Sequence, residues 1–251
     1  MYYISNVKNI YDNYADIYEA MYRSFMDYPA EYAFYQKILK RYKSRSILEI
    51  GCGTGNLAAL LLKHPYKYIG LDSSDGMLQR AKERLPEQLF IKGKMQKFLI
   101  PHKVDACIFT GRTSSYLKTN IDVKKTFDAI YENLEPGGIV VFDIINANHF
   151  IKAISEKKMF IHEAGFEGRA FYRESVWTSN PKQLWAFDWA STYYEKLPGG
   201  KKKKLFEENS CVRSFTRDDM QLFLELSGFT VLSVISKASY AFDTVVFVAQ
   251  K

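Results

Sequence analysis

The segment EIGCGTGN at residues 49–56 constrains the fold more than any other part of this sequence. A short apolar run at 46–50 enters three closely spaced glycines, and a helix-like apolar stretch begins directly after them. Glycine allows a tight turn and lets a ligand approach the backbone closely. A strand, a glycine loop and a helix in this order form the first half of a βαβ unit. The segment therefore predicts an open α/β sheet with a ligand site at the carboxyl ends of its strands.

The alternation of strands and helices continues for about one hundred residues. Apolar runs predict parallel strands at 46–50, 66–72, 89–91, 104–110 and 139–145, with intervening helices at 56–64, 75–85 and 123–134. After residue 146 the pattern changes to longer extended segments, which indicate antiparallel strands at 171–177, 183–194 and 205–215. A capped helix over 216–226 and strands at 229–236 and 244–249 complete the chain.

These elements predict a Rossmann-like, doubly wound α/β fold: a mostly parallel seven-stranded sheet with an antiparallel β insertion after the fifth strand. We expect a single domain over 1–251. Residues 1–45 would form an amino-terminal helical cap, 46–145 and 216–251 a ligand-binding core, and 146–215 the insertion on the substrate side. In 185–193 large aromatic residues alternate with small or polar ones, which places them on one face of a strand. Trp185 and Trp189 could either pack against the main sheet or stack on a ring of the substrate.

Composition and charge indicate the cellular compartment of the protein and limit its binding partners. Cys52, Cys107 and Cys211 show no metal-binding spacing, and no signal-like or membrane-spanning apolar stretch is present. We therefore expect a cytoplasmic protein that binds neither a metal nor a membrane. The formal charge of +7 allows nucleic-acid binding. However, the lysines are mostly scattered, and the run 201–204 follows a predicted turn, so nucleic acid is the less favoured partner.

The spacing within the glycine segment excludes some classes of ligand. A dinucleotide fingerprint would place glycine or alanine where Asn56 stands, and no P-loop Gly-Lys-Ser/Thr follows. Asp72 comes twenty-one residues after Gly51, at the end of the second predicted strand. A carboxylate there could accept hydrogen bonds from ribose hydroxyls, or it could cap the helix that follows. The two signals together favour a nucleoside-containing ligand other than a dinucleotide.

The sequence resembles the class I S-adenosylmethionine-dependent methyltransferases over residues 46–145. The resemblance lies in ILEIGCGTG at 47–55, GLDSSDGML at 70–78 and LEPGG at 134–138. A weaker similarity, in Ala15-Asp16-Ile17-Tyr18 and in YLKT at 116–119, points to small-molecule members that dimethylate aminosugar nucleotides. The resemblance implies S-adenosyl-L-methionine as the cofactor and an enzyme that moves its methyl group to a small molecule.

The resemblance also implies which residues hold the cofactor. The glycines would pass under its methionine part, Glu49 would orient the loop or contact the amine, and Asp72 would hold the ribose. The full implied set is Tyr14, Tyr22, Glu49, Gly51, Gly53, Gly55, Asp72, Ser73, Met77, Met95 and Thr110. Related enzymes commonly carry an acidic residue where this chain has Lys94, and lysine has no acceptor for the adenine amine. Adenine would then be read by Gln96 or by backbone carbonyls, or held less tightly.

The candidates for chemistry at the acceptor are Arg112, Tyr116, Asp143 and His149, which follow or end the fourth and fifth predicted strands. Arg112 could bind a phosphate or carboxylate, Tyr116 could form a wall, Asp143 could orient the acceptor, and His149 could act as a base. Methylation of an amine such as an aminosugar is the favoured reaction. O- or C-methylation of a small natural product is the alternative, and nucleic-acid methylation is a weaker one. A homodimer is compatible with the sequence.

Overall fold

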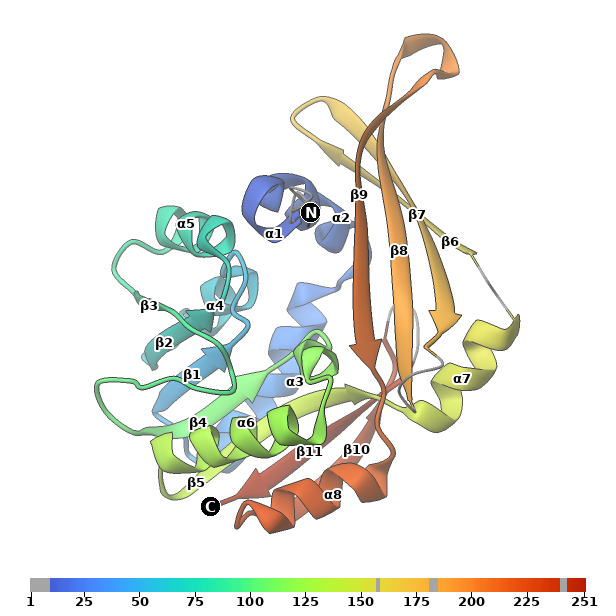
Figure 1. Cartoon of the computed structure of the whole chain (residues 1–251). Helices are drawn as coiled ribbons and strands as arrows, with labels where there is room; N and C mark the ends of the chain where they lie inside the picture. The colour runs from blue at the N-terminus through green and yellow to red at the C-terminus, as the bar shows by residue number, and fades with distance from the viewer. Residues whose placement is uncertain (1–9, 157–158, 181–184, 240–242) are drawn as a thin grey trace, which may run out of the picture.

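The structure is a computed structural model that describes residues 10–156, 159–180, 185–239 and 243–251. Within these ranges the main sheet has seven strands in the order β10-β11-β5-β4-β1-β2-β3 (Figure 1). Their bounds are β1 Ser46–Ile50, β2 Lys67–Asp72, β3 Leu89–Lys92, β4 Val104–Phe109, β5 Leu134–Ile145, β10 Thr230–Lys237 and β11 Thr244–Gln250. Strand β11 is antiparallel to both of its neighbours, and the remaining pairings are parallel. The predicted fold class is confirmed.

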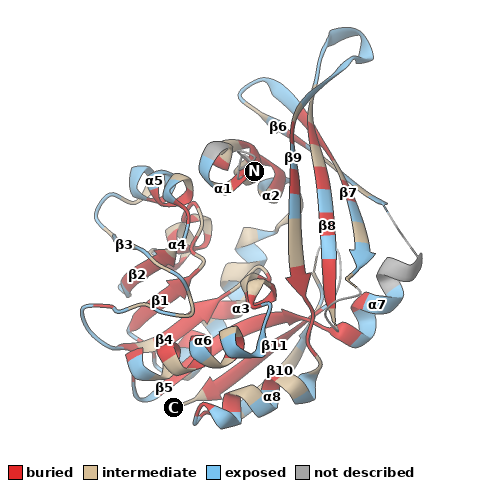
Figure 2. Ribbon diagram, viewed as in Figure 1, coloured by how far each residue is buried: buried red, intermediate tan, exposed pale blue. Residues whose placement is uncertain are grey.

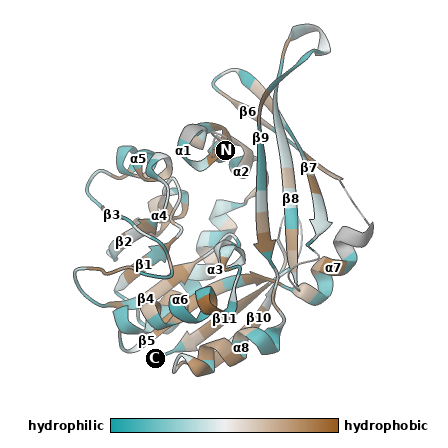
Figure 3. Cartoon of the chain, viewed as in Figure 1, coloured by the Kyte–Doolittle hydropathy of each residue, from teal (hydrophilic) through white to brown (hydrophobic). Residues whose placement is uncertain are grey.

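Helices cover both faces of this sheet, as a doubly wound fold requires. The helices are α1 Ile10–Asn13, α2 Ala15–Phe25, α3 Tyr28–Arg41, α4 Asn56–Leu61, α5 Asp75–Arg84, α6 Asn120–Asn133, α7 Ala147–Glu156 and α8 Arg217–Leu226. One core cluster joins α6 and α8 to one face, and another joins α3, α4 and α5 to the opposite face. Neighbouring residues of β1 divide between them: Leu48 lies in the first cluster and Ile47 in the second. Figure 3 shows the matching hydrophobic and hydrophilic bands along α6 and α8.

Local side chains set where the helices begin. Thr119 accepts a hydrogen bond from the Asp122 backbone, and the Asp122 carboxylate accepts one from Thr119 in return. This capping box starts α6 at residue 120, three residues before the predicted helix. Thr216 and Asp219 form the same arrangement at the start of α8. The prediction was also wrong in leaving out α7 and the strand after it, and β5 is longer than expected.

The insertion forms a separate antiparallel sheet in the order β6-β7-β8-β9. Its strands are β6 Met159–Phe166, β7 Arg169–Ser179, β8 Ala186–Lys196 and β9 Lys202–Arg213. A bridge between Asn146 and Phe215 joins its base to the end of β5, and the sheet rises from there beyond the carboxyl edge of the main sheet (Figure 1). Figure 2 shows buried segments along the strands and exposed hairpin tips. The lysine run 201–204 lies at the β8–β9 tip and is largely exposed, as predicted.

The amino-terminal helices fill the angle between the two sheets. Helix α1 packs on α5, and α2 packs on β6 (Figure 1). A core cluster combines Ile17 and Met21 of α2 with Phe171 and Phe206 of the insertion. The first nine residues of the predicted cap, and residues 183–184 of the predicted strand 183–194, lie outside the described residues. In the described part of the chain, no helix combines the length and apolarity needed to cross a membrane.

Candidate active site

The glycine loop leaves β1 with its backbone in the left-handed region. Gly51, Gly53 and Gly55 have φ values of +69°, +54° and +76°, which L-residues with a side chain rarely adopt. The Gly51 amide donates to the Leu71 carbonyl at 2.7 Å, which ties the loop to β2. A Cβ on Gly51 would lie 2.8 Å from the Thr113 side chain, whereas one on Gly53 would meet nothing within 4 Å. The loop is therefore packed on one side and open on the other.

Asp72 clamps this loop from the end of β2. Its Oδ2 accepts from the Gly53 amide and its Oδ1 from the Ser74 amide, each at 2.9 Å. Burial raises the pKa of the carboxyl, and the backbone hydrogen bonds act in the opposite direction. A carboxylate offers about four acceptor positions. Asp72 can therefore hold the loop and still accept from ligand hydroxyl groups.

A cavity of about 400 Å³, called here the donor cavity, lies against the open side of the loop. Its described lining comes from the turns that follow β1, β2, β3 and β4, as the topology rule for such sheets predicts, and from α1, α2 and the start of α5. The sequence-predicted residues that line it are Tyr22, Gly51, Gly53, Asp72, Ser73, Met77, Met95 and Tyr116. Lys94 and Gln96 line it as well. The structure thus brings together most of the predicted cofactor set.

A smaller cleft shares Tyr22, Gly51 and Gly53 with the donor cavity and holds two more of the predicted residues, Glu49 and Thr110. The Glu49 carboxylate is buried and accepts a hydrogen bond from the Tyr68 hydroxyl at 2.6 Å. Burial raises the pKa of Glu49 to about 8, and the Tyr68 hydrogen bond opposes this shift. At neutral pH this carboxyl is mostly protonated unless a cation binds beside it.

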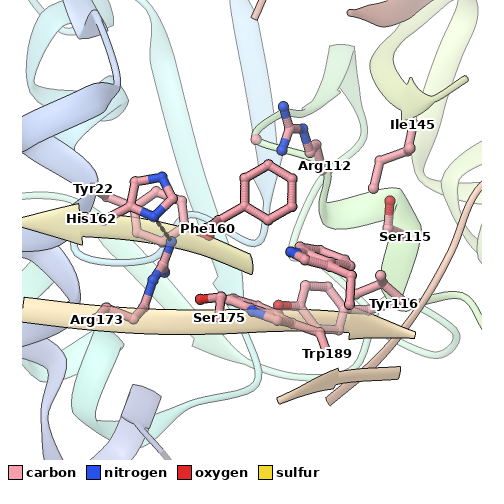
Figure 4. A pocket seen from close by; sticks show the side chains of 13 residues that line it. Tyr22, Arg112, Ser115, Tyr116, Ile145, Phe160, His162, Arg173, Ser175 and Trp189 are labelled. Carbon is pink, nitrogen blue, oxygen red and sulfur yellow. Dashed lines mark hydrogen bonds between the residues drawn. The ribbon is translucent and has the colours of Figure 1, made fainter. Parts of the chain in front are cut away.

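A third space, called here the insertion pocket, lies between the ends of β4 and β5 and the inner face of the insertion sheet (Figure 4). Its described lining is Tyr22, Gly111, Arg112, Ser115, Tyr116, Ile145, Phe160, His162, Arg173, Ser175, Trp177, Trp189 and Val212. Strand alternation explains the set: His162 pairs with Arg173, Phe160 with Ser175, and Trp177 with Trp189 across neighbouring strands. Figure 4 shows Arg112 reaching the pocket from the main-sheet side and Arg173 from the insertion.

The three spaces meet at two residues. Tyr22 and Gly111 line all three, and Tyr116 lines both the donor cavity and the insertion pocket. The Tyr116 hydroxyl is 2.5 Å from that of Tyr11, which also lines the donor cavity. Gly111 has φ +65°. The donor cavity and the insertion pocket therefore lie on two sides of a common boundary formed by Tyr22, Gly111 and Tyr116.

Comparisons with known proteins show which enzymes this chain resembles. Residues 47–138 match a family described as a methyltransferase domain. A protein of Geobacillus sp. (strain WCH70) that carries a methyltransferase name is 27% identical over 89% of this chain and 93% of its own length. The chain is an S-adenosylmethionine-dependent methyltransferase. The dTDP-3-amino-3,4,6-trideoxy-alpha-D-glucopyranose N,N-dimethyltransferase of Streptomyces venezuelae is 31% identical over 52% of this methyltransferase and 56% of its own length. The sugar N-methyltransferase KedS8 from Streptoalloteichus has the same fold, with a TM-score of 0.79 at 20% identity over 93% and 92% of the two chains.

The residues around the donor cavity of this methyltransferase fit its cofactor, S-adenosylmethionine. The face of Gly53 that a side chain would fill is open to the cavity, and Asp72 retains acceptor capacity beside it. Met77 is buried against the same space and offers a polarizable surface for a flat ring. Four tyrosines line the same cavity: Tyr11, Tyr18, Tyr22 and Tyr116.

Three sequence-predicted residues lie elsewhere. His149 is exposed on α7 in a separate cleft with Asn148 and Arg217, because α7 turns away from the sheet edge. Its expected role as a base near the acceptor is therefore not supported. Tyr14 stacks on Phe206 of β9, with ring centroids 4.2 Å apart, so it faces the insertion and not the donor cavity. Gly55 caps α4 and faces Ala81, where it permits close helix packing and lines none of the three spaces.

Asp143 lies behind the site. It is buried in β5, and its Oδ1 accepts from the Arg112 amide at 3.0 Å, which holds the turn that contains Gly111. Burial raises the pKa of Asp143 to about 6, whereas the bond from Arg112 and the charge of Lys237 lower it. Asp143 is therefore placed to position the turn rather than to touch the acceptor.

Sequence reasoning missed several lining residues, chiefly Tyr11, Tyr18, Gly111, His162 and Arg173. The two tyrosines recur at helical spacing with Tyr22, which was a usable signal. Gly111 stands directly after a predicted strand. Arg173 lies inside the predicted strand 171–177, but its inward direction depends on pairing with β6 and β8, and β6 was not predicted.

Proposed function

We propose that this enzyme transfers a methyl group from S-adenosylmethionine to an amine of a small molecule, with aminosugars as the first class to test. The observation that carries the proposal is the shared wall. Tyr22, Gly111 and Tyr116 border both the donor cavity and the insertion pocket, so donor and acceptor would meet across them. Bound S-adenosylmethionine supplies a methyl group already activated on a sulfonium sulfur. The work of the protein is then to position the acceptor and to exclude water.

On the donor side, we assign the ribose to Asp72 and the adenine to the space between Met77 and Met95. Asp72 is held rigidly by two backbone amides, so its free acceptor positions point in a fixed direction. Gly51 and Gly53 would run beneath the methionine part, and Glu49 would face its ammonium group. Burial keeps the dielectric low around these groups, which strengthens charged hydrogen bonds.

On the acceptor side, an amine suits the groups that line the insertion pocket. Among its described lining residues there is no carboxylate, and His162 is the one imidazole. Arg173 Nη2 lies 3.0 Å from His162 Nδ1, and a guanidinium can only donate, so Nδ1 is an acceptor and the ring is neutral with its proton on Nε2. While this bond holds, His162 is not placed to take a proton at Nδ1. An amine that arrives neutral needs no base before methyl transfer. The similarity to the Streptomyces venezuelae aminosugar enzyme supports the same choice.

The proposal is tested by calorimetric titration of S-adenosylmethionine into wild type and Asp72→Ala, followed by methylation of an amine panel. We expect micromolar binding that weakens by roughly tenfold or more in the variant, because charged hydrogen bonds to the ribose are lost. Asp75→Ala is the matched control, since its carboxylate is exposed and lies outside the donor cavity. Folded wild-type protein that binds no S-adenosylmethionine would sink the proposal.

One observation favours a second candidate, O-methylation of a carboxylate. Arg112 and Arg173 both line the insertion pocket, and a carboxylate is already ionised and needs no base. The two reactions are separated by the product. A methyl ester is cleaved by mild alkali, whereas an N-methyl group survives it.

A further inference from the structure

The insertion pocket is rich in hydrogen-bond donors. Arg112 and Arg173 line it with side chains that are both more than nine-tenths buried. A guanidinium has five N–H donors and no acceptor. Burying two such groups at one small space is costly unless negative charge or acceptors lie nearby. Each guanidinium has a neutral partner: Arg112 Nη2 donates to Ser239 Oγ and Arg173 Nη2 to His162 Nδ1, each at 3.0 Å. Asp143 and Glu208 are close enough to interact with Arg112 and Arg173 respectively, yet neither carboxylate lines the pocket, so the lining carries positive charge without an anion of its own.

Two neutral groups of the same lining point to a missing partner. The Trp189 indole Nε1 and the Ser115 hydroxyl are buried, and neither has a hydrogen-bond partner. Trp189 is 7% exposed and Ser115 1% exposed, so solvent does not satisfy them in this conformation. Indole N–H can only donate. Unpartnered buried polar atoms are uncommon in folded proteins and call for a specific explanation.

The size of the pocket limits what that partner is. Its open volume is about 50 Å³, room for roughly three or four water-sized positions. A carboxylate or a phosphate group fits this space, and the rest of an acceptor as large as an aminosugar would extend from it towards Tyr22 and Gly111. The flat rings of Trp177 and Trp189, stacked with centroids 5.2 Å apart, form the apolar side of the same space.

We propose that the acceptor carries an oxyanion, a carboxylate or a phosphate, that binds in the insertion pocket between Arg112 and Arg173. The Trp189 indole and the Ser115 hydroxyl supply further hydrogen bonds to it. The anchor fixes one end of the acceptor, so that its nucleophile lies beside Tyr22 and Gly111, the residues shared with the donor cavity. This inference rests on the proposed function for the position of the acceptor, but it does not depend on whether nitrogen or oxygen is methylated.

The test uses the full-length protein saturated with S-adenosylhomocysteine, so that no methyl transfer occurs. Intrinsic tryptophan fluorescence reports on the pocket because Trp177 and Trp189 line it. Inorganic phosphate and acetate are titrated separately at constant ionic strength, with chloride as the reference. We expect a saturable change with phosphate, with acetate or with both. Phosphate alone indicates a phosphate ester in the acceptor, and acetate alone indicates a carboxylate.

Arg173→Met should weaken this binding by roughly tenfold or more. Arg169→Met is the matched control, because Arg169 lies on the same strand but pairs with Glu195 at the surface and lies outside the pocket. If Arg173→Met no longer binds S-adenosylhomocysteine, and so has lost its fold, Arg112→Met replaces it. The proposal is overturned if wild type shows no saturable response beyond that to chloride, or if both pocket variants bind as wild type does.

Failure of this inference is distinct from failure of the proposed function. If the protein binds S-adenosylmethionine and methylates neutral amines, but binds neither phosphate nor acetate, the proposed function stands and the oxyanion site is overturned. If the folded protein binds neither S-adenosylmethionine nor S-adenosylhomocysteine, the proposed function itself is overturned.

Discussion

The donor cavity and the insertion pocket are built in different ways. The donor cavity is formed mainly by turns at the ends of neighbouring parallel strands. At its centre lie the backbones of Gly51, held by the Leu71 carbonyl, and of Gly53, held by the Asp72 carboxylate. The insertion pocket is formed by side chains on one face of an antiparallel sheet, which contributes seven of its lining residues from β6 to β9. The first depends on conformation that few residue types can adopt, and the second on side-chain size and charge.

This difference has a functional meaning. A cavity built from backbone turns tolerates few amino-acid substitutions. This suits the binding of a cofactor, because every turnover requires the same cofactor. A pocket built from side chains on a paired sheet can be altered one residue at a time without disturbing the turns. We therefore expect substitutions in the glycine loop to abolish cofactor binding, and substitutions in the insertion to change acceptor use.

The largest contrast should come from two glycine-to-alanine changes. Gly51→Ala places a Cβ 2.8 Å from Thr113 at φ +69°, so the loop must move. We expect S-adenosylmethionine affinity to fall by roughly a hundredfold or more. Gly168→Ala, in the β6–β7 turn at φ +74°, meets nothing within 4 Å. It should cost about 1 kcal/mol of stability through backbone strain and leave cofactor affinity unchanged. Calorimetry gives the S-adenosylmethionine affinity of both variants, and thermal unfolding gives their stability. Equal losses of affinity in the two variants would contradict the prediction.

The same difference explains how much the sequence could predict. The parallel core and most of its ligand residues were predictable because each lies within a few residues of a strand end, so spacing along the chain fixes position in space. Gly51 and Asp72 are examples. His149 failed because nothing in its local sequence shows that α7 turns away from the sheet.

The insertion was predictable only in part. The period of two placed Phe187, Trp189 and Tyr193 on one buried face correctly, whereas Trp185 precedes the strand with φ +65° and lies outside the pocket lining. Arg173 and His162 are eleven residues apart and meet only through the register of β6 and β7. That register is set by the tight turn at Glu167 and Gly168, both with positive φ, and by strand β6, which was not predicted.

A smaller effect should separate donor from acceptor binding. Trp189→Leu removes an aromatic wall and an unpartnered indole from the insertion pocket but touches no residue of the glycine loop. We expect the acceptor KM to rise by about tenfold, with the Kd for S-adenosylmethionine within about twofold of wild type. Trp185→Leu is the control, since Trp185 lies outside the pocket lining. Steady-state kinetics with the best acceptor of the panel gives both values. A matching loss of cofactor affinity in Trp189→Leu would show that the two sites are not separable.

The smallest effect concerns Glu49, the buried carboxyl in the cleft beside the glycine loop. Burial raises its pKa to about 8 in the free protein, so about nine-tenths of it is protonated at pH 7. If Glu49 faces the cofactor ammonium, that cation favours the ionised carboxylate, and binding should release close to one proton. Affinity should then rise with pH up to about 8 and level off above it. The free protein should show the opposite trend in stability. A raised carboxyl pKa contributes stability that is complete below about pH 4 and is lost as pH rises towards 8.

Glu49→Gln tests this directly, because glutamine keeps the shape and can still accept the hydrogen bond from Tyr68. Calorimetry in two buffers of different ionisation enthalpy counts the protons released. We expect close to one proton for wild type and none for the variant. The variant should bind only a few times more weakly at pH 7, because the wild type must first give up its proton, and the difference should widen towards pH 9. Proton release that is equal in both proteins would mean that Glu49 only orients the glycine loop. In that case the donor cavity recognises its ligand through backbone turns and Asp72, and the contrast with the charged insertion pocket becomes sharper.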